Sequence, residues 1–162
     1  MYVSIPMPDG LSAFLAAEGP DMWHEFALGV EFSEPKGSID LLIAADQVTR
    51  SPNCDRATAA LLLAKAAEAG FHRGECPPGF DPMAARAFVV RLTDALLTGA
   101  FRQARFALPP TALRLVLKEL GPRGPLRLPP MAFGSQPHRP SHDFAGWRPV
   151  SPVALSAGVR AA

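Results

Sequence analysis

The chain has 162 residues, of which 48% are hydrophobic, and this is enough for a single soluble domain with a buried core. Its apolar runs fall far short of the ~20 residues that span a bilayer, and no basic segment followed by an apolar one marks export, so we expect a cytoplasmic protein without a membrane partner. The net charge of +1 hides an asymmetry, because 13 of the 15 acids lie in residues 1–100 and 9 of the 16 basic residues in 101–162.

Three short helices are predicted for the first 50 residues, because proline, glycine and capping residues divide this part into segments. Asp9 and Asp21 precede two apolar runs as N-caps, and a glycine follows each run. The acidic connector that comes next is interpreted as a loop. Ser38 then caps a third helix over residues 39–50.

A fourth helix is predicted to begin at Ser51 and Pro52, an N-cap followed by proline at the first helical position. Asp55 then lies in the first turn, where a carboxylate meets the positive end of the helix dipole. Cys54 lies on the face that enters the core, as a small inert hydrophobe. The run up to Glu68 is apolar nearly all round, which predicts the central helix of the domain.

Cys54 has a second interpretation, because a thiolate near a helix N-terminus has a lowered pKa and can act as a nucleophile. Such an enzyme needs a base close to the thiol, and His24 and His72 are the candidates, with Glu25 or Asp55 as an acid. The sequence contains no Gly-rich phosphate loop and no nucleophile elbow. We therefore favour the core role and predict no catalytic residue.

No metal and no cofactor are predicted. His72 and Cys76 form an H-x-x-x-C pair, but structural zinc requires four ligands. Both cysteines are expected to be free thiols, because nothing marks the chain for an oxidising compartment. His138, His142 and Asp143 lie close together in the sequence, and we interpret the two histidines as ordinary surface residues.

Two more helices are predicted before residue 122. Asp81 and Pro82 repeat the cap-then-proline start, and residues 83–98 place apolar side chains on one face. Gly99 ends this helix or kinks it before residues 100–108.

The last helix is predicted from residue 111 to 120, with Gly121 and Pro122 as the stop signal. Its apolar stripe, which we expect to face the core, consists of Leu113, Val116, Leu117 and Leu120. With six or seven short helices, residues 1–121 are predicted to form an all-α orthogonal bundle.

Residues 122–162 form a second region, a Pro-rich, basic tail that contains aromatic residues. Its prolines recur at a three-residue spacing that is typical of polyproline II. Disordered segments are generally poor in aromatic residues. We therefore expect this tail to be extended and to pack either on the helical body or on a partner.

The turn from Pro52 to Asp55, with the sequence Pro-Asn-Cys-Asp, precedes a helix that contains Thr58 and Ala59. Through this motif, residues 23–66 resemble a small bacterial helical domain family of unknown function. The connector before it lacks the tryptophan-aspartate pair typical of that family. The resemblance implies a helical domain, and it brings no catalytic residue because the family has no established activity.

The leading hypothesis is a non-catalytic protein-binding module, such as a regulatory adaptor or an inhibitor or immunity-type protein, that binds another protein through its body and tail. The residues expected to contact that partner are Phe133, Phe144, Trp147, Arg123 and Arg127. The sequence leaves the oligomeric state open.

Nucleic-acid association is the first alternative, based on the basic residues Arg102, Arg105, Arg114, Lys118, Arg123 and Arg127. Arg102 and Arg105 are predicted to lie on one helical face, and Arg114 and Lys118 are four residues apart, so short basic stripes are expected. The isoelectric point of about 7.9 is below the value of over ~9 that is typical of dedicated nucleic-acid-binding domains. An enzyme with Cys54 as nucleophile is the second alternative.

Overall fold

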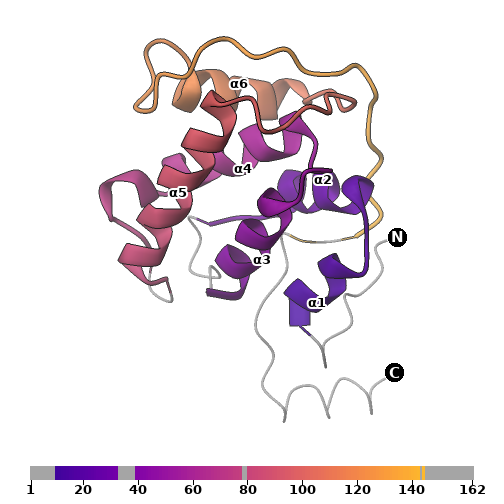
Figure 1. Ribbon diagram of the computed structural model, residues 1–162, viewed down its shortest axis with the longest axis horizontal. Helices are drawn as coiled ribbons and strands as arrows, with labels where there is room; N and C mark the ends of the chain where they lie inside the picture. The colour runs from indigo at the N-terminus through magenta and orange to yellow at the C-terminus, as the bar shows by residue number, and fades with distance from the viewer. Residues whose placement is uncertain (1–9, 33–38, 78–79, 143, 145–162) are drawn as a thin grey trace.

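The computed structural model describes residues 10–32, 39–77, 80–142 and 144, and these form an all-α fold, as predicted (Figure 1). The helices are α1 (Gly10–Ala16), α2 (Pro20–Gly29), α3 (Ile39–Arg50), α4 (Arg56–Glu68), α5 (Pro82–Leu97) and α6 (Pro110–Leu120), with a short 3₁₀ turn, η1 (Phe71–Arg73), after α4. None of the described helices is long and apolar enough to cross a membrane.

The central helix is α4, as its apolar sequence predicted. Ten of its 13 residues are buried, and α2, α5 and α6 all pack against it. Most of the buried residues are alanines and leucines, so neighbouring helices can approach closely on several sides. Figure 1 shows α6 lying across α4, and α5 packs on α4 as well.

The start of α4 differs from the prediction. Asp55 is the N-cap, and its carboxylate accepts a hydrogen bond from the amide of Ala57 at 3.0 Å. Ser51 and Pro52 lie instead in the turn between α3 and α4. The second carboxylate oxygen of Asp55 accepts a hydrogen bond from the amide of Arg105 at 2.6 Å. This long-range bond adds to the capping bond and favours Asp55 over Ser51 as the cap.

Of the N-caps predicted for the other helices, one is confirmed and one is wrong. Asp81 caps α5 as predicted, because it accepts a hydrogen bond from the amide of Met83 at 3.1 Å. The N-cap predicted at Asp21 is wrong, because α2 begins at Pro20, whose ring already has a helical φ. Asp21 lies in the first turn and forms an ion pair with Arg105 at 2.6 Å. The caps predicted before α1 and α3 lie outside the described residues.

Residues 100–109 contain no helix. The preceding helix ends before Gly99, which has a φ of 72°, a value that glycine adopts without steric cost. The backbone of the segment then pairs with the tail, since the amide of Gln136 donates to the carbonyl of Arg105 at 3.0 Å. The prediction that Arg102 and Arg105 share a helical face is therefore wrong.

Residues 122–142 of the tail lie on the helical body. The amide of Leu128 donates to the carbonyl of Leu120 at 2.8 Å, and the guanidinium of Arg56 donates to the carbonyl of Ala132 at 2.9 Å. In Figure 1 this orange segment follows α6 and then turns toward α2. The sequence left open whether the tail packs on the body or on a partner, and this part of it packs on the body.

Candidate functional site

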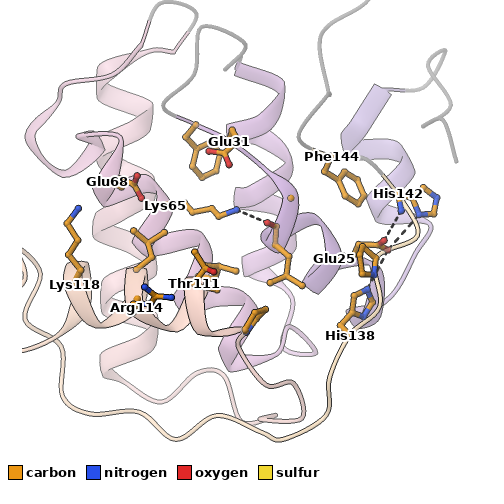
Figure 2. Close-up of a pocket in the computed structure, with 18 residues that line it drawn as sticks. Glu25, Glu31, Lys65, Glu68, Thr111, Arg114, Lys118, His138, His142 and Phe144 are labelled. Atoms are coloured by element: carbon orange, nitrogen blue, oxygen red, sulfur yellow. Dashed lines mark hydrogen bonds and ion pairs between the residues drawn. The ribbon is translucent and has the colours of Figure 1, made fainter. Parts of the chain in front are cut away.

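A groove of about 800 Å³ lies between α4, α6 and the end of α2 (Figure 2). Its remaining wall comes from the tail, where His138, Pro140, His142 and Phe144 line it. We call residues 138–142 together with Phe144 the strap. Apolar and charged side chains both line the groove, and its volume falls within the ~300–1,000 Å³ that is usual for small-molecule sites.

Lys65 extends from α4 into this groove. Its amine donates hydrogen bonds to the carbonyls of Leu28 at 3.0 Å and Val30 at 2.8 Å, at the end of α2. Burial lowers the pKa of Lys65 to about 8, and the carboxylates of Glu31 and Glu68 act in the opposite direction. The groove therefore contains an amine that loses its proton more easily than a surface lysine.

Glu25 fastens the strap to α2. Its carboxylate, which is 2% exposed, accepts hydrogen bonds from the amide of Ser141, from the Ser141 hydroxyl at 3.0 Å and from the amide of His142 at 2.7 Å. Burial alone would raise the pKa of Glu25, but these hydrogen bonds outweigh it and lower the pKa below its ordinary value. Glu25 is therefore held in its ionised form.

Two histidines flank this carboxylate, which corrects their interpretation as ordinary surface residues. Nε2 of His138 lies 3.6 Å and Nδ1 of His142 lies 3.7 Å from Oε2 of Glu25, and the two side chains are 14% and 12% exposed. Asp143 lies outside the described residues. Within the described residues, no group of three or more His, Cys, Asp or Glu side chains is placed to hold a metal ion.

His24 is fully buried next to this cluster. Its Nδ1 lies 2.9 Å from the hydroxyl of Thr58, and its ring stacks on Phe106 with centroids 4.4 Å apart. Burial, assisted by the nearby His138, lowers the pKa of His24 to about 4. The imidazole is therefore neutral at pH 7, with the role of a polar core residue.

We expect His24→Phe to flatten the pH dependence of stability between about pH 6.5 and 4. The unfolded chain binds a proton at His24 below its ordinary pKa of 6.5, whereas the folded protein does so only near 4, so the free energy of unfolding falls as the pH decreases through this range. At ~1.4 kcal/mol per pKa unit, the loss by pH 4 is about 3 kcal/mol. Urea unfolding at pH 7, 5.5 and 4 measures this loss. If the free energy of unfolding changed with pH equally in the variant and the wild type, the lowered pKa would not belong to His24.

Cys54 has the surroundings of a core residue. It is fully buried, and its thiol lies 3.6 Å from the backbone carbonyl of Asp55. Burial, and then the charge of Asp55, raise the pKa of Cys54 to about 12, so the thiol is protonated at pH 7. His24, one of the two proposed bases, points its Nδ1 at Thr58 instead. This arrangement does not fit a cysteine nucleophile.

The last helix exposes two leucines that the sequence placed in the core. Val116 and Leu120 are buried as predicted, but Leu113 is 37% exposed and Leu117 is 60% exposed. The apolar stripe of α6 is wider than the face that packs on α4, so the prediction is wrong for these two residues.

The exposed charges that α6 itself and the segment directly after it carry have one sign. On α6 and in the segment directly after it, they are Arg114, Lys118, Arg123 and Arg127. The carboxylate of this stretch, Glu119, is only 7% exposed. We call Leu113, Leu117 and these four cations the α6 outer face.

The residues predicted to bind a partner differ from one another in how far the structure exposes them. Arg123 and Arg127 are exposed, and Phe133 is half-buried. Phe144 is 2% exposed and packs its ring against Phe26, with centroids 5.6 Å apart, so it would reach a partner only by leaving this position. Trp147 lies outside the described residues.

No signal in the sequence predicts the groove or the attachment of the strap, because both join residues far apart in the chain. Comparison with protein-family models, with curated proteins and with solved structures finds no match to this chain.

Proposed function

We propose that this protein is a non-catalytic protein-binding module, of the regulatory-adaptor or inhibitor type, whose contact surface is the α6 outer face. The observation that carries the proposal is the exposure of Leu113 and Leu117 on a helix whose exposed charges are all positive. The partner accordingly presents an apolar centre surrounded by acidic side chains, because complementary charge guides association and disfavours other partners.

Exposed apolar residues alone would not distinguish α6 from α5. Single apolar residues at a surface are normal, and α5 exposes Met83 and Val90. Near them, however, Arg86 and Asp94 carry opposite charges. The combination of exposed leucines with charges of one sign singles out α6.

The same cations keep nucleic acid as the alternative partner. Binding to phosphates depends on the cations and falls steeply with salt, because each neutralised phosphate releases counterions. The two leucines add nothing to phosphate binding, whereas apolar side chains at the centre of a protein interface contribute much of its affinity. A substitution at Leu117 combined with nuclease treatment can therefore separate the two hypotheses.

The test compares capture from a host-cell extract by the full-length protein, by Leu117→Glu and by Val90→Glu. Leu117 and Val90 are 60% and 63% exposed, so both changes introduce the same charge at matched exposure on different helices. After nuclease treatment, we expect wild type and Val90→Glu to retain one protein in stoichiometric amount, and Leu117→Glu to retain at least ~10-fold less. An unpaired carboxylate in a desolvated contact costs more than the ~1.4 kcal/mol that this factor requires.

Two outcomes contradict the proposal. Equal recovery by both variants would place the contact surface away from α6. Loss of all recovery after nuclease treatment would favour the nucleic-acid alternative. Circular dichroism of the three proteins checks that differences in recovery do not arise from unfolding.

A further inference from the structure

The groove contains one lysine whose surroundings differ from those of a surface amine. Lys65 is half-buried, and the groove that it lines is also lined by Leu28, Phe32, Leu61 and Leu115. Figure 2 shows its side chain extending within the groove to a backbone carbonyl at the end of α2. The amine is thus held in place at a position that a small molecule in the groove can reach.

The two hydrogen bonds of Lys65 are compatible with a neutral amine. An ammonium group has three N–H donors and a neutral amine has two, and the carbonyls of Leu28 and Val30 accept two. The neutral form keeps both bonds and retains a free lone pair. Burial lowers the pKa to about 8 despite Glu31 and Glu68, so part of the amine is unprotonated at neutral pH.

We propose that Lys65 is a covalent binding site for small apolar aldehydes and ketones, which it holds as an imine. The nitrogen lone pair attacks the carbonyl carbon and forms the C–N bond, while the π electrons of the C=O bond move to oxygen, which takes up a proton. The nitrogen loses one proton as the carbinolamine forms and its second proton as the hydroxyl leaves as water, which gives the C=N bond and ends the two hydrogen bonds to the backbone carbonyls. The balance is amine plus carbonyl compound to imine plus water, and it needs no oxidant or reductant.

The lining of the groove indicates the class of compound. Groups of both signs already lie there, with Arg114 and Lys118 from α6 and Glu31 and Glu68 near Lys65. A further charge would be attracted by one of these sets and repelled by the other and would lose its hydration, whereas an uncharged apolar group adds to the contacts among the apolar side chains. A compact aromatic or aliphatic carbonyl compound therefore fits better than a charged one.

The chain supplies its own control, because it contains three lysines, Lys36, Lys65 and Lys118. Lys118 lines the same groove, but its side chain is 71% exposed. It reports the reactivity of an accessible amine in the same sample. Lys36 lies outside the described residues and serves only to complete the peptide map.

The experiment treats the full-length protein at pH 7.5 with benzaldehyde and cyanoborohydride, which reduces an imine to a stable amine, and maps the labelled lysines by mass spectrometry. We expect initial labelling of Lys65 to be at least ~10-fold faster than that of Lys118. With glyoxylate, a charged aldehyde, the preference is expected to disappear. Lys65→Arg, which keeps donors for the two carbonyls, is expected to retain the fold and lose only the label at this position.

Slower or equal labelling of Lys65 by benzaldehyde would overturn the proposal and reduce Lys65 to a structural partner of the α2 carbonyls. The same conclusion would follow if glyoxylate labelled Lys65 as selectively as benzaldehyde does, because the apolar lining would then have no effect. Both results come from the wild-type protein, so neither depends on the folding of a variant.

Discussion

Replacing Asp55 with alanine is expected to lower the free energy of unfolding by about 3 kcal/mol. This carboxylate is 1% exposed, and it accepts hydrogen bonds from the amides of Ala57 at 3.0 Å and Arg105 at 2.6 Å. Loss of the helix cap costs ~1 kcal/mol, and leaving the amide of Arg105 without an acceptor adds ~1–3 kcal/mol. Urea unfolding at pH 7 measures the total.

Asp81→Ala is the matched control for this change. Asp81 also caps a helix, through the amide of Met83 at 3.1 Å, but it is exposed, and within the described part of the chain its carboxylate accepts from no second amide. Its loss is expected to cost only ~1 kcal/mol. Equal losses for the two variants would show that the bond to Arg105 contributes nothing, and that the loop after α5 is attached in another way.

Replacing Glu25 with alanine is expected to release the strap from α2. The Glu25 carboxylate accepts hydrogen bonds from the amides of Ser141 and His142 and from the hydroxyl of Ser141. A hydrogen bond to a charged group contributes ~1.5–3 kcal/mol, so protection of these amides against hydrogen exchange should fall by roughly 10- to 100-fold. Exchange measured by NMR at pH 7 reports each amide separately.

Two further variants make this result specific. Glu25→Gln keeps a carbonyl oxygen as an acceptor but loses the charge, so it should fall between alanine and wild type. Glu18→Ala removes an exposed acid and should leave the strap unchanged. Unaltered protection in Glu25→Ala would show that other contacts of the strap, such as the packing of Phe144, are sufficient to hold it.

The lowered pKa of Glu25 also determines how the attachment of the strap changes as the pH falls. A carboxyl group whose folded pKa is depressed stabilises the protein fully above its ordinary value of 4.5 and loses this contribution as the pH falls through the folded value. The wild-type strap should therefore keep its protection down to pH 4.5 and lose it only below. His24 affects stability mainly between pH 6.5 and 4.5, above this range, so the effects of His24 and Glu25 on stability can be separated.

Local signals were sufficient for much of the helical fold. The cap at Asp81 and the stop at Gly121 depend on bonds within a few residues, and both were predicted correctly. The central position of α4 followed from a sequence that is apolar on nearly every side. Cys54 is buried as predicted, but it lies in the turn before α4 and not on a face of the helix. Such features depend on the residue types present and on their spacing.

The errors arose where distant residues decide the structure. Ser51 was predicted to cap α4 and Asp55 to lie in its first turn, but Asp55 is the cap, and its bond to Arg105, 50 positions away, was not visible in the sequence. The attachment of His142 to Glu25 joins residues 117 positions apart. Leu117 fits the apolar stripe of α6, but how much of that stripe is covered depends on the packing of α4 and the tail. The candidate sites could therefore not be predicted from periodicity.

The most direct test of the proposed function is site-specific crosslinking in host cells, with a photoreactive phenylalanine analogue in place of Leu117 and, separately, in place of Val90. The exposure of the two positions is nearly the same, at 60% and 63%. A protein that binds through the α6 outer face should give one protein adduct from position 117 and none from position 90. Adducts with nucleic acid at position 117, or the same protein adducts from both positions, would contradict it.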